Sequence, residues 1–145
     1  MNPKNKALKA IACCLVLMGC LIQSSCASDD SNPEYPKTVN IKFEVTTTRN
    51  SEAIITLTLN NQTETVVVES LPFSNTYAQT SVDAGTFLKL TYLENGIYVS
   101  GTGGVNSWTD YSAQLTITVG SEVVKSQSFE VTENTGILQI DYTFQ

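Results

Sequence analysis

A two-residue alternation of apolar and polar side chains constrains the fold of this chain more than any other feature. It holds over residues 39–45, 53–59, 88–92, 115–119 and 138–144. Successive side chains of a β-strand point to opposite faces, so each run predicts a strand with one buried face and one wet face. A helix would need apolar residues every three or four positions, and no stretch of this region keeps that period. The region is therefore expected to be all-β.

Turn-forming residues separate these runs into eight or nine short strands. Turns are expected at residues 60–62, 83–85, 95–96, 120–121 and 133–136. Asn95-Gly96 is the strongest hairpin signal, and it predicts a return strand over residues 97–100. Pro72 has no amide hydrogen, which indicates a sheet edge, a bulge or a crossing between sheets. The pattern predicts an antiparallel, immunoglobulin-like β-sandwich of about 7–9 strands.

The first 25 residues follow a different pattern from the rest of the chain. Lys4, Lys6 and Lys9 make a positive start, and residues 10–22 form an uncharged, apolar run. A helix that crosses the ~30 Å hydrocarbon core needs about 20 apolar residues, so this run is too short to span a bilayer. Its length and its basic flank are typical of a signal peptide. We therefore predict that residues 1–25 are an export signal.

All four cysteines lie at or before position 26, so the predicted domain has no disulfide framework. Around these cysteines the chain resembles bacterial lipoprotein precursors, in which a small residue precedes a Cys that is acylated before cleavage. Cys26 follows Ser24-Ser25 and is followed at once by polar residues, whereas Cys20 is followed by the apolar Leu21-Ile22. We expect the lipid on Cys26, and Cys20 is the alternative.

The lipoprotein resemblance implies a compartment and a domain plan. It implies several acyl chains, such as palmitate, on Cys26 and an anchor in a bacterial outer membrane. Residues 26–37 would then be the lipidated Cys and a flexible tether, and residues 38–145 the sandwich. Asp29-Asp30 looks like the acidic export tag of Bacteroidota surface lipoproteins, and a solvated linker is the alternative. The periplasmic and the surface-exposed face of the membrane both stay open.

Charge and residue types argue against several functions. Without residues 1–25, five basic and fourteen acidic residues remain, for a net charge of −9. Nucleic acid is bound mainly through Lys and Arg, so we expect no nucleic-acid partner. The chain has no His, the commonest general base and metal ligand, and its acids are scattered without a calcium-loop spacing. We therefore expect no enzyme, no cofactor and no metal.

The best candidate for a contact site is the aromatic group of Tyr98, Trp108 and Tyr111 around a glycine-rich stretch. An exposed Trp beside Tyr can stack on a sugar ring or anchor a protein partner. The alternative is that Trp108 covers one end of the sandwich core. The expected partners are thus the membrane, through the lipid, and a protein or a glycan of the cell envelope.

Three segments of the domain carry a second resemblance. They are Ile41-Lys-Phe-Glu-Val45, Leu71-Pro-Phe-Ser74 and Ile117-Thr-Val-Gly120. Their order and spacing are similar to those of MmpS-type transport-accessory proteins, which have a membrane anchor followed by one small β-sandwich. Phe73 stands where that family has Trp, a family cysteine is missing, and a lipid anchor replaces a transmembrane helix. The resemblance implies that the protein assists a membrane transporter that exports lipid-like or siderophore-like molecules.

The leading expectation is a membrane-anchored envelope lipoprotein whose sandwich binds or scaffolds without catalysis. An MmpS-like transporter accessory is one alternative. A carbohydrate or adhesive contact through Tyr98, Trp108 and Tyr111 is the other.

Overall fold

The computed structural model describes residues 34–96 and 108–145. The expected anchor Cys26, its alternative Cys20, the contact residue Tyr98 and the predicted return strand over 97–100 lie outside the described residues. Within the described part of the chain, no helix has the length and apolarity that crossing a bilayer requires.

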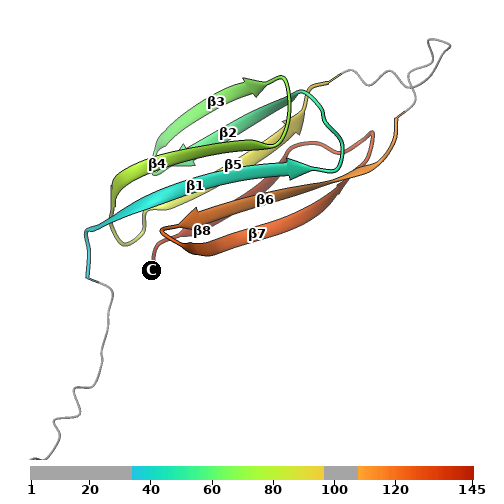
Figure 1. Ribbon diagram of the computed structural model, residues 1–145. Helices are drawn as coiled ribbons and strands as arrows, with labels where there is room; N and C mark the ends of the chain where they lie inside the picture. Colours follow the sequence, from blue (N-terminus) through green and yellow to red (C-terminus); the bar gives the residue numbers. More distant parts are fainter. Residues whose placement is uncertain (1–33, 97–107) are drawn as a thin grey trace, which may run out of the picture. The chain divides into compact units, whose positions relative to one another are not determined.

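Eight strands make up the described part of the chain. They are β1 (Lys37–Thr47), β2 (Ala53–Leu59), β3 (Gln62–Val68), β4 (Phe73–Val82), β5 (Phe87–Glu94), β6 (Tyr111–Val119), β7 (Glu122–Val131) and β8 (Leu138–Thr143). They form two antiparallel four-stranded sheets, in the orders β4-β1-β6-β7 and β3-β2-β5-β8 (Figure 1). The predicted antiparallel β-sandwich is confirmed, with a strand count inside the expected range.

The chain crosses from one sheet to the other at most of its connections, as in immunoglobulin-like sandwiches. Among the eight described strands, only β2–β3 and β6–β7 are joined as hairpins within one sheet. Both hairpin turns were predicted from sequence, and both use left-handed backbone, with φ 57° at Asn60 and 62° at Gly120. Pro72 lies between β3 and β4, where the chain changes sheets just before an edge strand, so that prediction is confirmed.

The return strand of the hairpin predicted at Asn95-Gly96 lies outside the described residues, so this hairpin stays a prediction. β5 pairs with β2 along one edge, from Leu88 to Glu94, and with β8 along the other, from Phe87 to Tyr92. Beyond the end of β5, Asn95 donates its backbone N–H to the carbonyl of Glu52, 3.0 Å away. β5 is thus held between two strands that are distant from it in sequence.

The core lies between the two sheets and is built from the inward face of each alternating run. Phe43, Leu57, Leu90, Tyr92 and Leu115 are at most 1 % exposed. Full burial of such a side chain stabilises the fold by about 1.5–3 kcal/mol. The alternation therefore specifies the core as well as the strands.

The chain enters the sandwich slightly earlier than its sequence suggests. Lys37 already lies in β1, and Tyr35 packs against the core. The hydroxyl of Tyr35 donates to the carbonyl of Gln145 over 2.8 Å. The start of β1 and the C-terminus thus lie together at one end of the sandwich, which we name the entry end (Figure 1, left). The opposite end, with the β1–β2, β3–β4 and β7–β8 connections, is named the far end.

Candidate functional site

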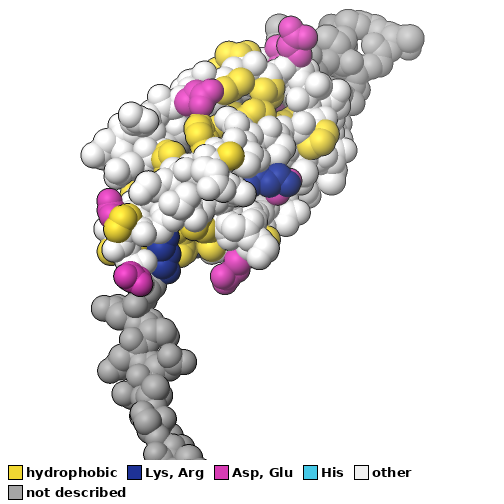
Figure 2. All heavy atoms as spheres, turned by 60° about the vertical axis from the view of Figure 1, so that its left-hand side comes forward, with side chains coloured by type: hydrophobic (Ala, Val, Ile, Leu, Met, Phe, Trp, Pro, Cys, Tyr) yellow, Lys and Arg dark blue, Asp and Glu magenta, His cyan; other side chains and the backbone are white. Residues whose placement is uncertain are grey.

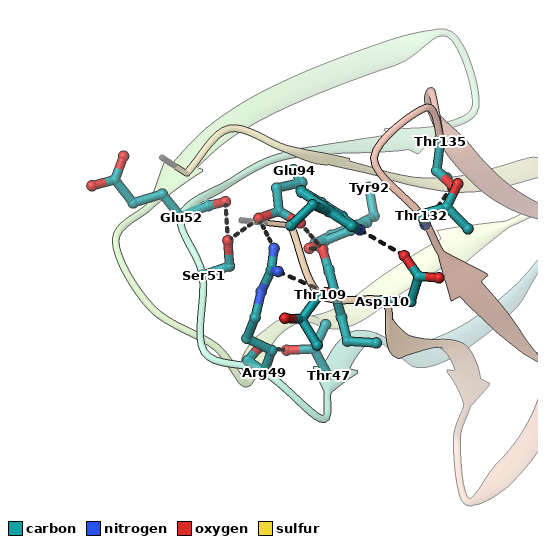
Figure 3. Close-up of polar contacts among 12 residues, drawn as sticks. Thr47, Arg49, Ser51, Glu52, Tyr92, Glu94, Thr109, Asp110, Thr132 and Thr135 are labelled. Atoms are coloured by element: carbon teal, nitrogen blue, oxygen red, sulfur yellow. Dashed lines mark hydrogen bonds and ion pairs between the residues drawn. The ribbon is translucent and has the colours of Figure 1, made fainter. Parts of the chain in front are cut away.

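A compact group of polar and aromatic side chains lies at the far end of the sandwich. We name it the far-end cluster, and it consists of Arg49, Ser51, Tyr92, Glu94, Trp108 and Tyr111. Arg49 and Ser51 come from the β1–β2 connection, Tyr92 and Glu94 from the end of β5, and Tyr111 from the start of β6. Figure 3 shows these segments, which are distant in sequence, converging on the Glu94 carboxylate.

The Glu94 carboxylate is the centre of the cluster. Its Oε1 accepts from Arg49 Nη2 and, over 2.6 Å, from the Ser51 hydroxyl, while its Oε2 accepts from the Tyr111 hydroxyl. The Tyr111 and Tyr92 hydroxyls lie 2.6 Å apart. The side chains of Arg49 and Glu94 are only 11 % and 10 % exposed. A charge pair withdrawn from water to this extent needs such hydrogen bonds, because they offset its desolvation.

Two aromatic rings enclose the Arg49 guanidinium. Its Cζ lies 4.4 Å from the Trp108 ring centroid and 4.2 Å from that of Tyr111. Its Nη1 donates to the carbonyl of Thr109 over 3.0 Å. The indole N–H of Trp108 donates to Asp110 Oδ1 over 2.8 Å. Cation–π contacts and hydrogen bonds therefore hold the plane of Trp108 in one orientation.

The tyrosines of the cluster act as hydrogen-bond donors and not as bases. Burial, followed by the hydrogen bond to Glu94, raises the pKa of Tyr111 above its usual range. Burial also raises the pKa of Tyr92, against the opposing effect of its hydrogen bond with Tyr111. Both hydroxyls stay protonated at neutral pH. In residues 34–96 and 108–145, moreover, no three acidic side chains converge as a metal-binding group.

The structure brings together two of the three aromatic residues expected at a contact site. The rings of Trp108 and Tyr111 lie 6.0 Å apart, centroid to centroid. Tyr111 is only 6 % exposed and its ring faces the core, so it supports the site from beneath and does not face solvent. Trp108 is half-buried: it packs against the core and also keeps exposed surface. It thus combines the core-covering role with a surface that a partner can reach.

Arg49 and Glu94 were not recognised from the sequence as site residues. One signal for Glu94 was present, because it continues the inward alternation of Leu88, Leu90 and Tyr92. A carboxylate on an inward face requires a buried donor. The identity of that donor depended on tertiary structure, since Arg49 lies 45 positions away in the chain.

The three segments on which the expected MmpS-type resemblance rests lie in or next to three neighbouring strands of one sheet, β4, β1 and β6. β1 pairs with β4 at Val45 and Phe73, and with β6 at Phe43 and Ile117. Phe43 and Ile117 are fully buried, and Phe73 is partly buried against the core. The apolar residues of the first and third segments are therefore core positions of one sheet.

No family model, no curated protein and no solved structure matches this chain.

Proposed function

We propose that this protein is a lipid-anchored module of a bacterial cell envelope that binds or scaffolds a partner without catalysis. In this proposal Cys26 carries the acyl chains, and the membrane in question is the outer membrane. Support comes from the basic start, the short apolar run and the polar residues that follow Cys26. More than one acyl chain is needed for stable anchoring, as expected of this type of lipoprotein.

One structural observation supports a binding role in particular. The start of β1 lies at the entry end, whereas Trp108 is held by Arg49 at the far end. From Cys26 to Lys37 an extended chain would reach about 36–40 Å. A domain anchored through that segment can present its far end away from the membrane. Loops on a rigid sandwich are common places for contact residues.

A glycan or adhesive contact through Trp108 is a second candidate function. The exposed part of its indole is fixed by Arg49 and Asp110, so little conformational entropy would be lost on binding. Tyr98, expected at the same site, lies outside the described residues. A transporter-accessory role, implied by the MmpS resemblance, remains the alternative, and it is supported by a shared core pattern only.

The anchor is tested by replacing each candidate cysteine in the full-length protein. Cys26→Ala is expected to abolish incorporation of labelled palmitate in cells and to release the protein from the membrane fraction. Cys20→Ala is the matched control and should keep both the label and the membrane location. Labelling that survives Cys26→Ala and is lost in Cys20→Ala would overturn the assignment.

The surface location is tested separately. A double change, Asp29→Asn with Asp30→Asn, should reduce cleavage of the protein by a protease added to intact cells. Unchanged cleavage would count against an export-tag role for these acids, while leaving the lipid anchor intact.

A further inference from the structure

A polar groove lies on the open side of the sandwich, between the edge strands β3 and β4 near the entry end. Its volume is about 440 Å³, within the ~300–1,000 Å³ range of small-molecule sites. The walls carry three carboxamides and three hydroxyls, from Asn60, Asn61, Gln62, Thr80, Ser81 and Thr86. A second hollow of about 360 Å³ adjoins it, because both are lined by Leu59 and Gln62. Thr63, Glu64 and Tyr77 complete that second hollow.

The chemistry of the walls selects for a neutral, polar ligand. The first hollow has no charged residue in its lining, so an ionic ligand would find no opposite charge there. An apolar ligand would displace water from the wall groups without replacing their hydrogen bonds, at a cost in free energy. Carboxamides and hydroxyls both donate and accept, which matches ligand hydroxyls. Figure 2 turns the left-hand side of Figure 1 toward the viewer: most of the surface in this view is uncharged, and charged side chains gather toward its lower end.

Several of these polar groups are available to a ligand. Asn61, Gln62 and Ser81 are exposed, and within residues 34–96 and 108–145 their side chains make no hydrogen bond to another protein group. Thr86 differs, since its hydroxyl is buried and accepts from the backbone N–H of Asp83 over 3.0 Å. Water therefore satisfies the exposed wall groups, and ligand hydroxyls can take its place.

One contact supports the groove, and another supports the hollow that adjoins it. Asn60, with its left-handed backbone, donates its N–H to the carbonyl of Phe87 over 2.7 Å. The hydroxyl of Tyr77 donates to Glu64 Oε2 over 2.6 Å, which joins β4 to β3 across the open side. Burial and this hydrogen bond raise the pKa of Tyr77 to about 12, so the bridge persists at neutral pH. The walls are thus preorganised before any ligand arrives.

We propose that this groove binds a neutral glycan, either a short oligosaccharide or the end of a longer chain. The carboxamides of Asn61 and Gln62 and the hydroxyl of Ser81 hydrogen-bond the sugar hydroxyls, and the half-buried ring of Tyr77 offers an apolar face in the adjoining hollow. The proposal deepens the proposed function by naming a ligand class, and it rests on that function only in taking the sandwich to be a binding module. It does not require the anchor.

The test uses the full-length chain in a zwitterionic detergent that has no sugar headgroup. Binding is measured by microarray and calorimetry on neutral oligosaccharides (gluco-, manno- and galacto-series), on uronic-acid oligosaccharides and on an extended neutral peptide. The wild type is expected to bind at least one neutral series and to bind the acidic series and the peptide more weakly. Neutral hydrogen bonds are worth about 0.5–1.5 kcal/mol, so Asn61→Ala and Gln62→Ala should each weaken binding about 2- to 12-fold.

A matched control is available on the opposite edge of the sandwich. Gln127 is an exposed glutamine of the edge strand β7, outside the groove, and Gln127→Ala should leave the affinity unchanged. All variants should keep the wild-type melting temperature, so that a change in affinity reports on the groove. Failure of the wild type to bind any neutral series, or equal losses in the Gln127 and Gln62 variants, would overturn the proposal.

Two further outcomes separate this site from the other proposals. Glycan binding that is lost in Trp108→Ala but kept in the Asn61 and Gln62 variants would place the ligand at the far end and refute the groove. A preference for the peptide would assign the open side to strand addition, which also refutes the glycan. The Cys26 experiment tests the lipid anchor independently of these two outcomes. The anchor proposal and the glycan proposal can therefore be refuted separately.

Discussion

The far-end cluster and the groove at the entry end use polar side chains in opposite ways. In the cluster, three donors engage the Glu94 carboxylate, and the Arg49 and Glu94 side chains are about nine-tenths buried. In the groove, Asn61 and Gln62 are exposed, and within the described residues their side chains make no hydrogen bond to another protein group. Polar groups that satisfy one another stabilise and position the fold, whereas those satisfied by water remain free to bind a ligand.

The difference follows from where each region lies in the sandwich. Glu94 is on the inward face of β5, so its charge has to be matched from within. The groove lies at the edges of two sheets, where water reaches its exposed wall groups, among them Asn61, Gln62 and Ser81. Substitutions should therefore affect stability at the far end and binding at the entry end.

The largest effect on stability is expected from Glu94→Ala. This change leaves the buried Arg49 without its carboxylate and should lower the free energy of unfolding by about 3–5 kcal/mol. Glu44→Ala is the control, because its ion pair with Lys42 is exposed and is worth at most about 1 kcal/mol. Urea unfolding of both variants measures the difference. Equal losses would show that the far-end pair is no more important than a surface pair.

A smaller loss is expected from Tyr111→Phe. The change removes a donor to Glu94 and a partner of Tyr92, both in a buried setting, and should cost about 1–3 kcal/mol. Tyr77→Phe removes one exposed hydrogen bond to Glu64 and should cost about 0.5–1 kcal/mol. If Tyr77→Phe proved the more damaging in urea unfolding, the contrast between the two regions would be reversed.

Alkaline pH should destabilise the fold through the same tyrosines. Tyr77, Tyr92 and Tyr111 have pKa values above 10.0 in the folded protein, so they hold their protons more tightly than in the unfolded chain. Their contribution to stability is fully present below pH 10 and is lost as the pH rises through the folded values, about 12 for Tyr77. Melting temperatures between pH 8 and pH 11.5 should fall above pH 10, and less steeply in Tyr111→Phe. A flat profile would contradict the assignment.

Fluorescence of Trp108, the single tryptophan, reports on the far end directly. Its half-buried indole is expected to emit between the buried and exposed extremes and to be partly quenched by acrylamide. Emission typical of a buried indole, with no quenching, would remove Trp108 as a contact residue.

The smallest effects on stability are expected in the groove. Asn61→Ala and Gln62→Ala should each change the free energy of unfolding by no more than about 0.5 kcal/mol, because surface substitutions without internal partners are usually near neutral. Chemical denaturation checks this. A loss of 2 kcal/mol would mean that these carboxamides serve the fold and not a ligand.

The strands and their turns were determined by local sequence. Alternation depends only on neighbouring side chains, and left-handed backbone at Asn60 and Gly120 depends on the turn residue itself. For that reason the β-sandwich and both of its hairpins could be predicted. The closeness of the Trp108 and Tyr111 rings could also be predicted, because the two residues are near each other in the sequence.

Tertiary structure alone decided which strands pair and which polar groups are buried. β5 pairs on its two edges with strands that are distant in sequence, and no local pattern identified these partners. The partner of Glu94 lies 45 positions away, and the groove joins the turn after β2 to the end of β4. Local patterns do not encode contacts between residues that are far apart in sequence, and these contacts are decided by tertiary structure. Contacts of this kind are set by the packing of the two sheets against each other. That packing minimises exposed apolar surface and requires each buried charge to be paired.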